Sequence, residues 1–218
     1  MPPYPTEGGT SVSWMLVGYI AKRRTTRAGW VSPRPEYPEF GFPCPAPVEE
    51  ICSVSNCIAR GAGGTDDPAS DPPLGLYAHA GRAWAMVPAE ARADFALYAY
   101  RLWPVQFEDG QEEAIDLWWE PAVRPIAGTF VRLGWDAVVG GNGHSFGCSP
   151  LSCNSGTDIV RCPELNRYCL VGNERAAMAL ARSFSVTQPE PGPYCVVEVW
   201  RDTATAAVYK QPEVKPCL

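Results

Sequence analysis

Apolar residues along this chain fall into short runs separated by long stretches rich in proline and glycine. The runs combine aromatic and β-branched residues, which favours strands over helices. They predict strands at 14–20, 97–107, 129–139 and 194–200, a short strand at 167–171, and a short strand or turn at 50–58. Alanine-rich segments predict helices over 88–96, where proline suits the first turn, and from Asn173, a good N-cap, to about Phe184. Strands followed by a helix in each half indicate an α+β fold.

Short motifs occur twice along the chain in the same order, which is a sign of internal duplication. The clearest is Cys-Ser-x-x-x-Cys at 52–57 and again at 148–153, and its flanks recur as well. The matched motifs are 14–19 with 130–135, 52–57 with 148–153, 84–90 with 168–174, and 100–103 with 197–200.

The repeated motifs predict two diverged copies of one unit, each a small β-sheet covered by a helix, related by a pseudo-twofold axis. Residues 1–107 form the first repeat, 108–128 a connector and 129–218 the second repeat. A length of 218 residues allows each copy its own core. Cys52 and Cys148 are expected at equivalent places.

Composition and charge narrow the classes of partner. The net charge of −6 argues against nucleic acid, because phosphate binding needs clustered lysine and arginine. The single basic run, Lys22-Arg23-Arg24, is interpreted as a solvated loop or strand end. No run approaches the roughly 18 apolar residues that span a bilayer, and the start at Met1 is unlike a signal peptide, so we expect a cytoplasmic protein without a membrane partner.

Nine cysteines at irregular spacing, in the reducing compartment expected above, predict buried thiols rather than a disulfide framework. Cys52, Cys57, Cys148 and Cys153 could meet across the pseudo-twofold axis as a Cys₄ zinc site. The usual spacing between paired zinc ligands is about two residues, whereas here it is four. We therefore expect a structural motif without metal.

The sequence offers two catalytic alternatives, a cysteine nucleophile and a transferase-like site. A cysteine nucleophile would need His79 or His144, and neither stands beside an orienting carboxylate in the sequence. Arg132, Ser149 and Glu198 follow the Arg, Ser, Glu order of ADP-ribosyltransferase-like enzymes that use NAD.

The first repeat weakens the second alternative. At the matched positions it has Leu16, Ser53 and Arg101, so only the serine recurs. The glycines at 140–143 lack the Lys-Ser/Thr that follows in a P-loop, and no cofactor is expected.

Three segments carry a resemblance to known proteins: Ser-Val-Ser-Asn-Cys at 53–57, Cys-Ser-Pro-Leu-Ser-Cys-Asn at 148–154, and the Glu-Pro-Gly-Pro-Tyr-Cys-Val-Val-Glu-Val-Trp ending at 190–200. With them the chain resembles a set of two-copy bacterial proteins. That set is similar to the peptide-binding proteins encoded beside ribosomally synthesised peptide natural products (RiPPs) such as the crocagins. The resemblance implies a non-catalytic scaffold that binds a precursor peptide for modifying enzymes, and it names no catalytic residue.

Aromatic residues are the candidate peptide anchors, because tryptophan and tyrosine dominate interface energies. We expect Trp118, Trp119, Trp30 and Tyr77 to contribute, with the peptide added as a strand at a sheet edge. The expected function is thus peptide binding without catalysis, and the alternative is an ADP-ribosyltransferase-like enzyme. Whether the protein is a homodimer is left open.

Overall fold

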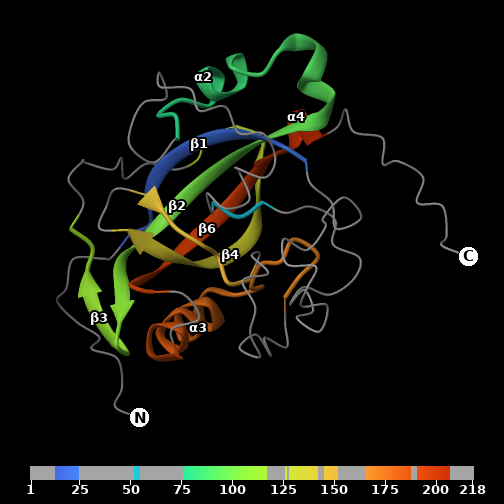
Figure 1. The fold of residues 1–218 in the computed structure, drawn as a ribbon. Helices are drawn as coiled ribbons and strands as arrows, with labels where there is room; N and C mark the ends of the chain where they lie inside the picture. The colour runs from blue at the N-terminus through green and yellow to red at the C-terminus, as the bar shows by residue number, and fades with distance from the viewer. Residues whose placement is uncertain are drawn as a thin grey trace, which may run out of the picture.

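The fold is α+β, an antiparallel sheet with helices at its ends (Figure 1). The computed structural model describes residues 13–24, 52–54, 76–116, 126, 128–141, 145–151, 165–187 and 191–206. Several residues singled out from the sequence lie outside these ranges: Trp30, Cys57, Trp118, Trp119, His144 and Cys153.

Both halves of the chain contribute strands to one sheet. Its strand order is β1-β2-β6-β4-β5, with β3 paired to β2, and every pairing is antiparallel. The central neighbours β2 and β6 come from different halves, so the two halves share a continuous sheet. The strands are β1 (Met15–Arg23), β2 (Phe95–Glu108), β3 (Gln111–Ala114), β4 (Phe130–Gly141), β5 (Ser145–Phe146) and β6 (Tyr194–Asp202).

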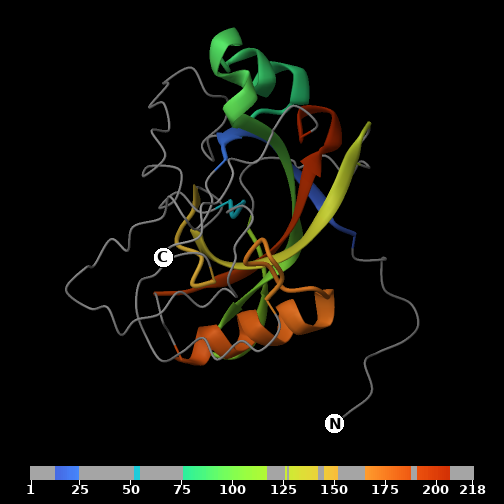
Figure 2. The ribbon, with the colours of Figure 1, turned by 90° about the vertical axis from the view of Figure 1, so that its right-hand side faces the viewer.

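The two main helices lie at opposite ends of the sheet, with α2 at the top and α3 at the bottom of Figure 2. Asn173 caps α3 as predicted, since its side-chain oxygen accepts the backbone N–H of Ala176 at 2.8 Å. The helix predicted over 88–96 is shorter, a 3₁₀ turn that ends at Asp94, because Phe95 already pairs with β1. The helical elements are α2 (Ala80–Ala85), η2 (Ala89–Asp94), α3 (Glu174–Thr187) and α4 (Thr203–Ala206).

The two faces of the sheet bury different partners, because successive strand residues point to opposite sides. On one side, Tyr98 and Tyr100 pack with Cys52. We call this side the motif face. On the other side, the helix face, Ala99 packs against α2 and Val196 packs against α3.

Two glycines in different strands, Gly18 of β1 and Gly134 of β4, have closely similar surroundings. Their φ angles are +149° and +151°, and each follows a β-bulge in its strand. A Cβ on Gly18 would lie 2.8 Å from the Cβ of Leu76, and one on Gly134 would lie 2.9 Å from the Cβ of Leu170. Only glycine can adopt this backbone conformation with another segment of the same chain so close.

The residue after each glycine pairs with a short crossing segment. Tyr19 exchanges two backbone hydrogen bonds with Tyr77, at 2.7 and 2.8 Å, and Trp135 exchanges two with Val171, at 2.8 and 3.0 Å. In both cases a helix begins three residues later, α2 after Tyr77 and α3 after Val171. The order bulge, glycine, bridge and helix therefore occurs twice in the fold.

The segment predicted as a strand at 167–171 is instead a tight turn held by Asn166. The Asn166 side-chain oxygen accepts the backbone N–H groups of Tyr168, at 2.9 Å, and Leu170, at 3.3 Å. Cys169 has a φ of +57°, which a strand residue does not adopt. A side chain that bonds its own backbone thus replaces the strand ladder here.

Candidate functional site

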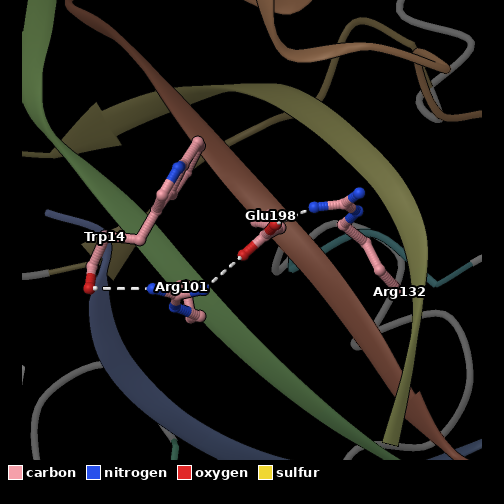
Figure 3. Close-up of polar contacts among 4 residues, drawn as sticks. All are labelled: Trp14, Arg101, Arg132 and Glu198. Atoms are coloured by element: carbon pink, nitrogen blue, oxygen red, sulfur yellow. Dashed lines mark hydrogen bonds and ion pairs between the residues drawn. The ribbon is translucent and has the colours of Figure 1, made fainter. Parts of the chain in front are cut away.

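A row of charged residues crosses the centre of the helix face. Glu198 of β6 lies directly opposite Arg101 of β2. Arg101 Nη1 lies 3.1 Å from Glu198 Oε2, and Arg132 Nη1 of β4 lies 3.1 Å from Oε1. Figure 3 shows the two arginines approaching the carboxylate from opposite sides, and a third bond, 3.3 Å, from Arg101 Nη2 to the Trp14 carbonyl.

Four tryptophans lie near these charges, and the rings of two of them contact Arg132. The ring centroids of Trp14 and Trp103 are 5.2 Å apart. The guanidinium carbon of Arg132 lies 4.5 Å from the ring centroid of Trp135 and 5.8 Å from that of Trp200. Arginine over an indole face is the geometry of a cation–π contact. We call Arg101, Arg132, Glu198 and these four tryptophans the Trp–Arg patch.

The carboxylate of the patch is buried, whereas its two arginines reach the surface. Glu198 is buried, with 2% of its side chain exposed, whereas the side chain of Arg101 is 22% exposed and that of Arg132 is 48% exposed. The carboxylate therefore holds two guanidinium groups from below while Arg132 still reaches solvent. Two positive charges against one negative charge leave the patch with a net charge of about +1.

Hydrogen-bond donors in the patch outnumber its acceptors. Within the part of the chain that the structure describes, Arg101 Nε, Trp135 Nε1 and Trp200 Nε1 are buried without an acceptor. Buried N–H groups are normally paired, because an unpaired one costs about 1–3 kcal/mol. Because these three atoms are buried, a partner that docks from solvent would instead meet the exposed guanidinium of Arg132, which carries N–H donors beyond the one bonded to Glu198.

A second polar cluster lies on the motif face and joins the two Cys-Ser segments. Ser149 Oγ donates to Asp136 Oδ1 at 2.7 Å, and the Ser53 hydroxyl also hydrogen-bonds to this carboxyl group. Lys22 Nζ donates to the Ser53 carbonyl. We call Lys22, Ser53, Asp136 and Ser149 the buried polar cluster, since none is more than 8% exposed.

Burial shifts the titration of this cluster. Loss of solvent raises the pKa of Asp136 from 3.8 to about 6, although the bonds from Ser53 and Ser149 and the charge of Lys22 pull it down. Loss of solvent likewise lowers the pKa of Lys22 from 10.5 to about 8, against the attraction of Cys52 and Asp136. Near neutral pH the cluster therefore holds a buried, oppositely charged pair.

The burial of Lys22 corrects the interpretation of the basic run as solvated. Lys22 is 8% exposed, and only the next residue, Arg23, is exposed. The reason is the strand period: Lys22 lies opposite Ala96 on the motif face, and Arg23 points to the other side.

Of the three residues in the transferase alternative, the structure brings two together. Arg132 and Glu198 form an ion pair on the helix face. Ser149 bonds to Asp136, which follows Trp135 in β4 and therefore points to the opposite face. Tyr77, a predicted peptide anchor, is 8% exposed and packs in the core beside Tyr19.

The described cysteines differ in their chemistry. Cys52, Cys148 and Cys195 are buried thiols, and burial raises the pKa of Cys195 to about 12. Cys169 is disulfide-bonded, unlike the buried thiols predicted for the cysteines in general. The described ranges contain no group of three or more His, Cys, Asp or Glu side chains placed to hold a metal ion.

Sequence reasoning missed the burial of Lys22, the role of Asp136 and the pairing of Arg101 with Glu198. All four are charged residues inside strands that are mainly apolar. A charge in such a strand must be paired or neutralised when it is buried, so this pattern was the available signal. It could not identify the partners, because they lie on other strands.

Comparison with protein-family models, with curated proteins and with solved structures finds no match to this chain. Among the described residues, no helix is long and apolar enough to cross a membrane.

Proposed function

We propose that this protein binds a peptide on the Trp–Arg patch without turning it over. As a scaffold, it would present a precursor peptide to the modifying enzymes of a RiPP pathway. The observation that carries the proposal is the patch itself: two partly exposed arginines are held by the buried Glu198 on the helix face, beside three tryptophans that are only partly buried.

The residue types support a binding surface. Tryptophan and arginine are the residues most enriched among those that dominate interface energies. Trp14, Trp103 and Trp200 are only partly buried, unlike Trp135. The double ion pair of Glu198 restrains both guanidinium groups in advance, which reduces the entropy lost on binding.

The same ion pair argues against catalysis at Glu198. A carboxylate that is 2% exposed and bound by two guanidinium groups is poorly placed to contact a substrate. Ser149 belongs to the opposite face of the sheet. The transferase alternative therefore has no assembled site in its favour.

An internal duplication accounts for the pairs of matched features. Gly18 and Gly134 would be equivalent, and so would Ser53 and Ser149, which meet at Asp136. Gly18 lies opposite Tyr100 and Gly134 lies opposite Val199, while Tyr100 and Val199 face each other.

The pseudo-twofold axis would therefore pass between Tyr100 and Val199. In this strand register, Tyr100 of the first copy corresponds to Val199 of the second. The sequence motifs instead aligned Tyr100 with Val197, so the two alignments differ by two residues. The helix face near the axis is where Arg101 and Glu198 lie, so the proposed binding surface would sit at the junction of the two copies.

The test is affinity selection from a mixture of soluble synthetic peptides, 12 residues long, random in sequence and with free ends. Peptides retained by the protein are identified by mass spectrometry and measured by titration calorimetry. We expect micromolar or tighter binding that is weakened at least tenfold by Trp200→Ala, a partly buried residue of the patch, and unchanged by Met86→Ala, an exposed apolar residue of the loop after α2.

A parallel assay follows the consumption of NAD by the wild-type protein and by Glu198→Gln. Selected peptides that bind, with no NAD consumed, support the proposal. Failure to retain any peptide, or NAD consumption that is lost in the Glu198→Gln variant, contradicts it.

A further inference from the structure

We propose that the Trp–Arg patch recognises a carboxylate, so that its peptide ligands carry an acidic side chain or a free C-terminus docked on Arg132. This inference rests on the proposed function, since it specifies which chemical group the bound peptide presents.

The first argument is charge. The protein carries a net charge of −6, yet the patch places Arg101 and Arg132 around one carboxylate, Glu198. Counting only the described residues, an anion arriving at the patch meets one uncompensated positive charge in a partly desolvated place, where Coulomb attraction exceeds its value in bulk water. A cationic or neutral ligand would gain nothing from this charge.

The second argument is the number of hydrogen-bond donors. Within the described residues Arg132 gives one bond, from Nη1 to Glu198, although a guanidinium carries five N–H donors. Its remaining donors belong to a side chain that is 48% exposed, so a ligand that arrives from solvent can reach them. A carboxylate is a suitable partner, because it offers about four acceptor positions and no donor.

The third argument is the geometry around Arg132. Its guanidinium lies against the rings of Trp135 and Trp200, at 4.5 and 5.8 Å, and its side chain remains 48% exposed. Contact with the rings restrains the planar group, and the exposed part can bind a second carboxylate with two parallel hydrogen bonds. Lysine, a point charge, would not offer this fork.

The neighbouring tryptophans add a second requirement for the ligand. Trp200 flanks Arg132, and Trp14 and Trp103, whose rings are tilted by 58° to each other, belong to the same face of the sheet. An apolar residue next to the carboxylate would bury its side chain against these rings. The ligand class is thus a peptide with an acidic group beside an apolar or aromatic residue.

The experiment uses the 12-residue peptides selected from the random mixture described above. Each is synthesised in four forms: unchanged, with a C-terminal amide, with Asp and Glu replaced by Asn and Gln, and with both changes. Titration calorimetry on the full chain measures all four forms. We expect at least a tenfold loss of affinity when the docked carboxylate is masked, and the form that loses affinity identifies its source.

Protein variants assign the effect to the patch. Arg132→Gln should lower the affinity of the unchanged peptide at least tenfold and leave the doubly neutralised form within twofold, which also shows that the variant is folded. The matched control is Arg175→Gln, which makes the same charge change at an exposed position of α3. It should leave both affinities unchanged.

The outcomes separate this inference from the proposed function. Peptides that bind equally well in all four forms retain the proposed function and overturn carboxylate recognition. An Arg175→Gln loss as large as that of Arg132→Gln also overturns it, because the effect would then be one of overall charge. If no peptide is retained, the proposed function fails and this inference fails with it.

Discussion

Asp136→Asn should remove a loss of stability that the wild-type protein undergoes between acid and neutral pH. Burial raises the pKa of Asp136 from 3.8 to about 6 in the folded state. A raised pKa means that the folded protein binds the proton more tightly than the unfolded chain does. The resulting stabilisation is complete below about pH 4 and is lost as the pH rises through about 6.

The magnitude follows from the pKa values. A rise from 3.8 to about 6 corresponds to about 3 kcal/mol, since a tenfold change in the proton equilibrium is about 1.4 kcal/mol. Of this, about 2 kcal/mol falls between pH 4 and pH 6. Asparagine does not titrate, so the free energy of unfolding of the variant should gain about that amount on the wild type across this interval.

Lys22 provides an internal control. Its pKa of about 8 lies above the interval, and loss of the Asp136 charge removes one of the two attractions that hold that pKa up. Without its charged partner, Lys22 should lower the free energy of unfolding of Asp136→Asn, and by nearly the same amount at every pH between 4 and 6. In Lys22→Met the charge that lowers the Asp136 pKa is gone, so the loss of stability should move to higher pH.

Urea unfolding followed by far-ultraviolet circular dichroism, at pH 4, 5, 6 and 7 without reductant, measures these differences. Other carboxylates titrate in the same range, but they do so equally in the three proteins and cancel in the comparison. Wild-type and Asp136→Asn curves that stay parallel from pH 4 to pH 6 would refute the reasoning, as would a Lys22→Met profile shifted to lower pH.

Three further outcomes are expected. Gly134→Ala should lower the free energy of unfolding by about 2 kcal/mol or more, because its Cβ would lie 2.8 Å from a backbone oxygen at a φ of +151°. Gly81→Ala is the control and should be neutral or stabilising, because its Cβ would have no atom within 4 Å. Equal effects of the two variants in urea unfolding would contradict the geometry. Cys195, with its pKa near 12 and 2% exposure, should resist iodoacetamide at pH 8 until the protein unfolds, as peptide mapping would show; rapid labelling of the native protein would count against its burial. Protein purified without added metal should contain less than one zinc per chain by elemental analysis, and stoichiometric zinc would revive the Cys₄ hypothesis.

The sequence predicted the α+β class and the positions of the four long strands. The Asn173 cap and the central apolar strand β6 are confirmed, because both depend on local chemistry: a capping side chain, and a run of residues that a buried strand favours. The prediction over 88–96 was wrong at its end for a tertiary reason. Alanine favours helix, but the pairing of Phe95 with Arg23 extends β2 into the segment.

The candidate sites depended on tertiary structure. Glu198 was considered as a catalytic residue only in the transferase alternative, and its two arginine partners come from β2 and β4, on either side of β6. Ser149 was matched to Ser53 as a repeated motif, and both bond to Asp136, to which the sequence analysis gave no role.

The amino-acid sequence by itself determined what neighbouring residues can settle, namely periodicity, capping and the presence of repeated motifs. The strand order and register decided the rest, because they bring Arg101 within 3.1 Å of Glu198 although 97 residues separate them along the chain. Whether a charged side chain is solvated, as Lys22 was expected to be, or buried in a polar cluster is a property of that register. It appears only when the sheet is assembled.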